Sequence, residues 1–282
     1  VPAVRAVRAW REWHACVRAC VFACYIKNNK KKIYKVNKEI GFLAHIQGHI
    51  FILGLQGELR ILNIKTKKVI KKIAIEKNIK LNRINDGKTD PNGNLWFGTM
   101  DNLERKIEKG SLYKLDKNLL LTKVDTNYRI TNGPAFIDQY NFYHTDSPKK
   151  KIYKIKINKD NKIINKKIFK KLSPEDGSPD GMTLDKYKNL WVAHFNGARV
   201  SVFNKNAKLI HKINLPAQNI TNCAFGGQNN NELFITSATK GMNKAGLQKF
   251  RYSGFLFSVK TNSKGILQKK FILSNEKKRS LL

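Results

Sequence analysis

The chain has 282 residues, of which 55 are Lys or Arg and 20 are Asp or Glu, so its formal net charge is +35 at pH 7. This length is enough for one large domain that buries most of its unfolded surface, although two smaller domains are also compatible with it. No run of about 18 apolar residues occurs, which excludes a membrane helix in this sequence and favours a soluble, globular body.

The excess of lysine is spread along the chain together with abundant Asn and Ile, a trio that an AT-rich coding sequence favours. No lysine run is interleaved with stacking aromatics, as single-strand binding requires, so a specific nucleic-acid partner is the less favoured alternative. The four cysteines form no Cys-x-x-Cys pair and imply no disulfide framework. We therefore predict a cytoplasmic protein without a membrane partner.

In chain order, residues 1–25 differ from everything that follows. They contain no lysine and run as a near three-residue repeat of Ala, Val, Arg and Cys, whereas the text from Ile26 onward is rich in Lys, Ile and Asn. A signal peptide and a basic amphipathic helix are alternatives, but charged residues interrupt any apolar core. We interpret residues 1–25 as an atypical segment from a misread or frame-shifted start, and residues 26–282 as the folded domain.

The rest of the chain is built from a repeat of short apolar strands. One strand recurs every 43 to 48 residues, with an aromatic marker at Phe51, Trp96, Tyr143, Trp191 and Phe234. A second strand pattern occurs six times, beginning at Ile33, Leu59, Leu112, Ile152, Val200 and Leu256. Periods of this length are typical of propeller blades. We predict an all-β, six-bladed β-propeller whose first blade is incomplete or damaged; an irregular β-sandwich is the alternative.

Polar residues recur at one register of this repeat. Counting back ten residues from the strand gives Asn85, Asn132 and Asp180 in three blades, and a fourth blade comes within one residue of Asn222. Each residue taken singly could be a turn former beside glycine. Their shared register instead predicts that they converge at one end of the propeller. Carboxylate and amide oxygens are the ligands that hard divalent cations take, so the ring predicts a metal site.

At these residues the sequence resembles the regucalcin/gluconolactonase family, also called the senescence-marker-protein family. The resemblance covers about Ile26 to Val259 and rests on several motifs in order, among them Asn-Arg-Ile-Asn-Asp-Gly at 82–87, Thr-Asn-Gly at 131–133 and Pro-Asp-Gly-Met at 179–182. It implies a six-bladed propeller that hydrolyses sugar lactones with one divalent ion. It further implies that Asn132 and Asp180 are metal ligands, that Asp180 is the general base, and that Arg83 and Asn85 hold the substrate.

The sequence departs from the family pattern at two places. The family's Gly-Glu-x-Pro turn, which supplies a third metal ligand, is absent; counting ten residues back from Phe22 gives Glu12 as the replacement, or else a solvated glutamate. The family's acidic substrate contact after Gly-Thr-Met falls on Leu103 here, and Asp101 or Glu104 could take its place.

We therefore predict an enzyme, a metal-dependent lactonase that converts a small sugar lactone to an aldonic acid with Ca²⁺, Zn²⁺ or Mn²⁺. The catalytic residue is Asp180, the substrate residues are Arg83 and Asn85, and the metal ligands are Glu12, Asn132 and Asp180. A non-catalytic propeller that has lost a metal ligand and only binds its partner is the alternative. Arg83 could also simply brace the turn at 85–87. The oligomeric state does not follow from the sequence.

Overall fold

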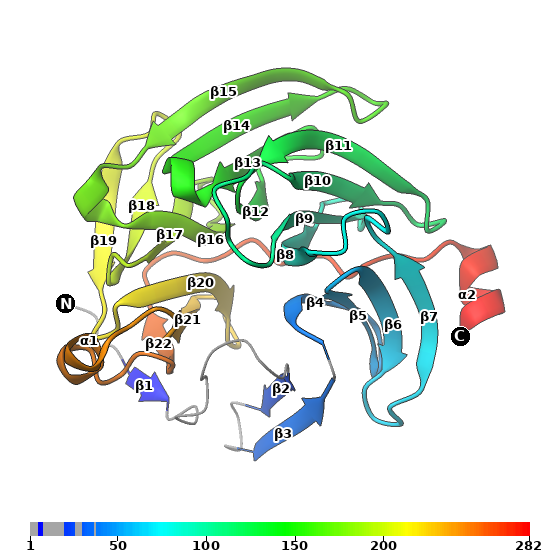
Figure 1. Cartoon of the computed structure of the whole chain (residues 1–282), viewed down its shortest axis with the longest axis horizontal. Helices are drawn as coiled ribbons and strands as arrows, with labels where there is room; N and C mark the ends of the chain where they lie inside the picture. Colours follow the sequence, from blue (N-terminus) through cyan, green and yellow to red (C-terminus); the bar gives the residue numbers. More distant parts are fainter. Residues whose placement is uncertain (1–4, 8–19, 26–29, 37) are drawn as a thin grey trace. The chain divides into compact units, whose positions relative to one another are not determined.

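The computed structural model describes residues 5–7, 20–25, 30–36 and 38–282, with side chains for residue 36 and residues 38–282. The strands of this part form antiparallel sheets in which neighbours in sequence are neighbours in space (Figure 1). The chain divides into two compact units, one made of residues 16–131 and 269–282, the other of residues 1–15 and 132–268. They are called the 16–131 unit and the 132–268 unit below.

The 16–131 unit contains two complete four-stranded sheets. The first comprises β4 (Ile40–Gln47), β5 (Ile50–Leu55), β6 (Glu58–Asn63) and β7 (Val69–Ala74). The second comprises β8 (Asn82–Thr89), β9 (Leu95–Asp101), β10 (Gly110–Leu115) and β11 (Leu121–Tyr128). Strand β8 packs against β4 and β5. The unit also holds the two-stranded pair β2 (Cys20–Tyr25) and β3 (Lys30–Lys35), and α2 (Asn275–Leu281).

The 132–268 unit contains three four-stranded sheets. The first comprises β12 (Thr131–Phe136), β13 (Asn141–Asp146), β14 (Lys151–Ile157) and β15 (Ile163–Lys171), and the second comprises β16 (Ser178–Leu184), β17 (Leu190–Phe195), β18 (Arg199–Phe203) and β19 (Leu209–Asn214). The third comprises β20 (Asn219–Gly226), β21 (Glu232–Ala238), β22 (Leu256–Lys260) and the N-terminal strand β1 (Arg5–Val7). Short helices η2 (Ser147–Lys149), η3 (Pro174–Asp176) and α1 (Lys244–Lys249) connect strands.

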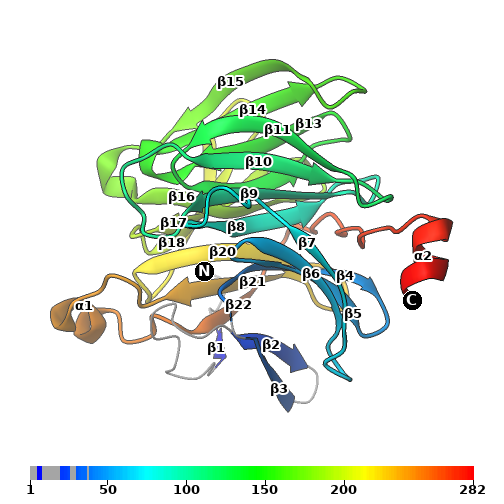
Figure 2. The same cartoon turned by 45° about the vertical axis from the view of Figure 1, so that its right-hand side comes forward.

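Five sheets of four antiparallel strands are blades of an all-β propeller (Figure 2); four follow the chain from one strand to the next, and the N-terminal strand β1 completes the fifth. The prediction of an all-β propeller is confirmed. The prediction of six blades exceeds what the described residues form, which is five blades and the pair β2–β3. The sixth copy of the strand pattern, at Ile33, lies in β3, and β3 has only β2 as a described neighbour.

The sequence repeat has a hydrogen-bonding cause. In the turn before β9, the Asp90 carboxylate accepts from the backbone N–H groups of Asn92 and Asn94 at 2.9 Å each, and from the Trp96 indole N–H at 2.9 Å. Asp185 repeats this pattern before β17, where the Trp191 indole donates to it at 3.1 Å. One aspartate thus accepts the hydrogen bonds of the backbone N–H groups in the turn and of the buried indole, which is why Asp and Trp recur six residues apart.

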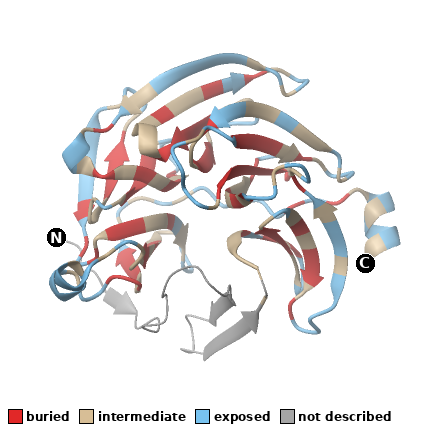
Figure 3. Cartoon of the chain, viewed as in Figure 1, coloured by how far each residue is buried: buried red, intermediate tan, exposed pale blue. Residues whose placement is uncertain are grey.

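In the four blades from β4 to β19, the last strand is more exposed than the strands before it (Figure 3). Every residue of β9 is buried, while β7, β15 and β19 are mostly exposed. The apolar side chains of successive strands fill the space between blades inside each unit, as where the Trp191 ring lies edge-on to Phe225 of the next blade at 5.2 Å. Among the described residues, no helix has the length and apolar character needed to cross a membrane.

Candidate functional site

The predicted polar register coincides with irregular pairing in the first strand of three blades. In β8 the pairing with β9 skips Asn85, and in β16 the pairing with β17 skips Asp180 and Gly181. In β20 the skipped residue is Thr221, one position before the expected Asn222. A bulge of this kind bends the strand and re-aims the side chain of the extra residue. The register therefore reflects a repeated backbone feature and is more than a recurrence of turn-forming residues.

Asp180 occupies its bulge with a close local fit. Its Oδ1 accepts a hydrogen bond from the backbone N–H of Gly181 at 2.9 Å. A Cβ atom on Gly181 would lie 2.2 Å from the amide carbon of Asn222 on the neighbouring β20, so a larger residue here would displace the Asn222 side chain. The Asp-Gly pair thus combines a carboxylate at the bulge with the space that the next blade requires.

Asn132 is held by a serine that the sequence did not indicate. Its Nδ2 donates to the Ser147 hydroxyl at 2.8 Å, and that hydroxyl donates to the backbone carbonyl of Pro179 at 2.6 Å. Asn132 and Ser147 are both buried. Because the single hydroxyl proton goes to Pro179, Ser147 must accept from the amide nitrogen. The amide oxygen of Asn132 therefore lies on the branch away from Ser147, and the chain of bonds ends at the residue before Asp180.

Ser147 links Asn132, a predicted metal ligand, to the backbone carbonyl of Pro179, the residue before the predicted ligand Asp180, inside one unit. Its sequence signal is weak, since it is one serine after the apolar strand β13 and before Pro148. Only the packing of one blade on the next brings it to the carbonyl of Pro179.

Arg83 and Asn85 are joined directly in the 16–131 unit. The Nη1 of Arg83 donates to Asn85 Oδ1 at 2.7 Å and to the carbonyl of Ile84 at 3.3 Å, and Asn85 Nδ2 donates to the carbonyl of Thr131 at 2.7 Å. Arg83 thus orients the Asn85 side chain and braces the bulge, and these contacts are compatible with both roles considered for it. Its Nε also lies 3.6 Å from a carboxylate oxygen of Glu39, a residue that the sequence did not indicate.

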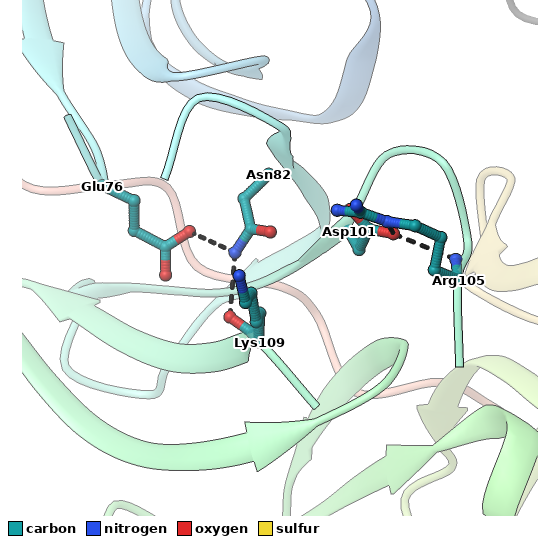
Figure 4. Close-up of polar contacts among 5 residues, drawn as sticks. All are labelled: Glu76, Asn82, Asp101, Arg105 and Lys109. Carbon is teal, nitrogen blue, oxygen red and sulfur yellow. Dashed lines mark hydrogen bonds and ion pairs between the residues drawn. The ribbon is translucent and has the colours of Figure 1, made fainter. Parts of the chain in front are cut away.

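Asp101, one of the two acidic residues considered as a replacement substrate contact, pairs with Arg105 (Figure 4). Asp101 is buried, and its carboxylate accepts from the Arg105 guanidinium at 2.7 and 3.0 Å and from the Arg105 backbone N–H at 2.9 Å. The hydrogen bond from Arg105 holds the pKa of Asp101 below its usual range. Leu103, at the expected position, is 62% exposed. Asp101 therefore braces the 101–105 loop.

A second polar cluster closes the base of the same loop. Glu76 accepts from Asn82 Nδ2 at 2.8 Å, and the same nitrogen donates to the carbonyl of Lys109 at 2.8 Å (Figure 4). The other carboxylate oxygen of Glu76 accepts from the hydroxyls of Thr99 and Tyr113 at 3.0 and 2.9 Å. These bonds join β8, β9 and β10 behind the Arg83 region, so we assign them a structural role.

His194 is a buried histidine whose ionisation is perturbed by the fold. It is fully buried on β17, opposite Pro179, and its Nδ1 lies 2.8 Å from the carbonyl of Asp176. Burial lowers the pKa of His194 to about 4. The ring is therefore neutral at pH 7, with its proton on Nδ1, where a carbonyl accepts it.

Asp180 and Asn132 are the predicted metal ligands that lie within the described residues. Glu12, the predicted third ligand, lies outside the described residues. Over residues 38–282, no group of three or more His, Cys, Asp or Glu side chains that could hold a metal is found. Asn132, with an amide oxygen fixed by Ser147, and the Asp180 carboxylate are chemically suited to a hard cation, and such sites often add amide and water oxygens to few carboxylates.

Together the fold and these residues define an all-β propeller with polar side chains at a repeated bulge. Residues 18–239 match the family described as the SMP-30/Gluconolactonase/LRE-like region. The chain belongs to this family, and the resemblance seen in the sequence is confirmed.

Known relatives match over most of the chain. It is 30% identical to regucalcin of Xenopus laevis over 84% of this chain and 82% of that protein. It is 35% identical to the "Putative sugar lactone lactonase YvrE" of Bacillus subtilis over 65% of this chain, and it spans 63% of that relative's length, just under two thirds. A calcium-binding regucalcin of Agrobacterium tumefaciens has the same fold, with a TM-score of 0.85 at 21% identity over 90% of this chain and 86% of that one.

Proposed function

We propose that this protein is a lactonase that opens a small sugar lactone to an aldonic acid. The observation that carries the proposal is the Asn132–Ser147–Pro179 hydrogen-bond chain beside Asp180, in a chain whose family includes gluconolactonases. It orients the Asn132 amide and ends at the residue before Asp180, so an amide oxygen and a carboxylate are available to a divalent cation and a general base. The sugar-lactonase relative gives the substrate class.

Asp180 is the general base in this proposal. Its carboxylate takes a proton from water as the water oxygen bonds to the lactone carbonyl carbon. The bond between that carbon and the ring oxygen then breaks, and the proton passes to the released alkoxide, which leaves as a hydroxyl of the aldonic acid. Arg83 and Asn85 bind hydroxyl or carbonyl oxygens of the lactone, because the guanidinium and amide offer donors in a fixed geometry.

Asn132 and Asp180 would hold the divalent ion, with Glu12 as the third protein ligand. When bound, Ca²⁺, Zn²⁺ or Mn²⁺ would supply Lewis-acid polarisation of the lactone carbonyl. Ser147 keeps the Asn132 amide oriented for this contact. We also propose that residues 26–282 are the lactonase-like domain, that a sixth blade completes the propeller, and that the protein is cytoplasmic.

A panel of sugar lactones tests the proposal. Hydrolysis of D-glucono-δ-lactone and related aldonolactones, followed by acid release at constant pH, is measured after chelation and after adding back Ca²⁺, Zn²⁺ or Mn²⁺ separately. We expect activity that chelation removes and one of these ions restores. Full activity in the metal-free protein would refute the role of the ion, and no hydrolysis of any aldonolactone with any of the ions would refute the lactonase.

The alternative is a propeller that binds a sugar lactone or aldonate without hydrolysing it. The observation that favours it is the missing Gly-Glu-x-Pro motif, which leaves one carboxylate in the described donor set. Calorimetry with D-gluconate separates the two, since saturable binding without turnover under all metal conditions supports the alternative.

A further inference from the structure

Glu39 lies just before β4, and its carboxylate is one of the groups closest to the Arg83 guanidinium. The Glu39 Oε2 atom is 3.6 Å from Arg83 Nε, and the side chains are 21% and 12% exposed, respectively. This oxygen is buried and has no hydrogen-bond partner. The carboxylate therefore interacts with the guanidinium electrostatically, at a distance too long for a hydrogen bond, while the Nη1 of Arg83 donates to Asn85.

The fold brings these two residues together through Gly41. A Cβ on Gly41 would lie 2.4 Å from the carbonyl oxygen of Ile84 and 2.6 Å from that of Asn85. Any other residue at this position would push β4 away from β8. The pairing of β4 with β5 also shifts register at Gly41. Glu39 lies two residues before Gly41, so this backbone packing between adjacent blades places Glu39 beside Arg83.

The pair determines the charge that Arg83 presents. The chain carries 55 basic and 20 acidic residues, so carboxylates are scarce and most of its surface attracts anions. An isolated guanidinium in this setting would bind phosphate or carboxylate groups strongly. With Glu39 beside it, the arginine keeps its hydrogen-bond donors but loses most of its net attraction for an anion.

We propose that Glu39 is a specificity-determining residue that acts through Arg83, so that the site accepts uncharged polyhydroxy lactones and disfavours lactones bearing phosphate or carboxylate groups. The inference rests on the proposed function for the identity of the substrate. The compensation of Arg83 by Glu39 can be tested without it.

The test compares wild type, Glu39→Gln, the double variant Glu39→Gln/Arg83→Gln, and Glu58→Gln as a matched control. Glu58 belongs to another Glu–Arg pair of the same unit, with Arg60 on β6, so its replacement makes the same change of net charge. Two quantities are measured. One is the ratio of kcat/KM for 6-phospho-D-glucono-δ-lactone to that for D-glucono-δ-lactone. The other is the affinity for inorganic phosphate by calorimetry.

Glu39→Gln should raise both quantities by about 10-fold or more, the factor expected for one uncompensated unit charge a few ångström from an anion in a partly solvated site. Both gains should vanish in the double variant, and Glu58→Gln should match wild type. Unchanged ratios and affinities in Glu39→Gln, or equal gains in Glu58→Gln, would overturn the inference.

The design separates the two failures. If wild type hydrolyses neither lactone, the proposed function fails, and the phosphate affinities still decide whether Glu39 compensates Arg83. If Glu39→Gln does not fold, Glu39→Ala carries the same test, with Glu39→Asp as the charge-retaining control that should keep the wild-type preference. A purely structural role of Glu39 would lower stability in every variant without changing the preference between anionic and neutral ligands.

Discussion

Replacing Ser147 by alanine tests the hydrogen-bond chain that fixes Asn132. The substitution removes the bonds of 2.8 Å from Asn132 and 2.6 Å to Pro179, and leaves a buried amide N–H and a buried carbonyl without this partner. Two lost bonds and their desolvated groups amount to about 2–4 kcal/mol of unfolding free energy. For a chain of this size, that loss lowers the melting temperature by about 3–7 °C.

Ser201 offers a matched control in the same unit. It is fully buried on β18, and its hydroxyl has no hydrogen-bond partner. Ser201→Ala therefore deletes the same oxygen without breaking a bond, and should leave stability unchanged or raise it by up to about 1 kcal/mol. Urea unfolding of wild type and both variants, followed by circular dichroism, measures the difference directly.

Calcium titration of the same three proteins measures the consequence for the proposed site. Without the Ser147 hydroxyl that orients Asn132, affinity should fall by about 10-fold or more, as is typical when a partner that orients a ligand is removed. Ser201→Ala should bind calcium as wild type does. Equal stability and equal calcium affinity of the two alanine variants would refute the assignment of Ser147 as the group that orients Asn132.

Four further predictions concern single residues. Asp180→Ala should abolish lactone hydrolysis and weaken divalent-ion binding in a folded protein, and calorimetry showing wild-type affinity would exclude Asp180 as a ligand. Arg83→Ala should lower kcat/KM by roughly 10–1000-fold through loss of charged hydrogen bonds, with little change in ion affinity; a destabilised variant with wild-type kcat/KM would show that Arg83 only braces the bulge. His194 has a folded pKa of about 4, below its unfolded value of about 6.5. Because the folded protein holds His194 neutral, this group contributes its full stabilisation above about pH 6.5, and the contribution, up to about 3 kcal/mol, is lost as the pH falls toward 4. Urea melts at pH 4.5 to 7 give the difference in unfolding free energy between wild type and His194→Asn. This difference should change with pH only below about pH 6.5, and a constant difference would contradict the prediction. Asp90→Ala should cost about 2–4 kcal/mol because the turn and the Trp96 indole lose their shared acceptor, while activity per folded molecule, from parallel melts and kinetics, stays unchanged.

The sequence alone determined the class of fold and the residues of the polar register. Asp90 and Asp185 recur with Trp96 and Trp191 because a carboxylate must satisfy both a tight turn and a buried indole, and that local requirement leaves a readable spacing. Asn85 and Asp180 were likewise visible, because in both of their blades a bulge lies at the same distance from the next strand.

The tertiary structure decided which groups surround those residues. Ser147 and Glu39 lie 32 and 44 residues from Pro179 and Arg83 in the chain, and only the packing of one blade on the next brings them into contact. Neither has a motif, because a hydroxyl or carboxylate that acts across a blade boundary needs only the right place in space. Asp101 shows the converse, since its position suggested a substrate contact until the fold placed Arg105 against it. Local hydrogen bonding leaves a pattern in sequence, whereas contacts between blades depend on how β-strands twist and pack, which no spacing encodes.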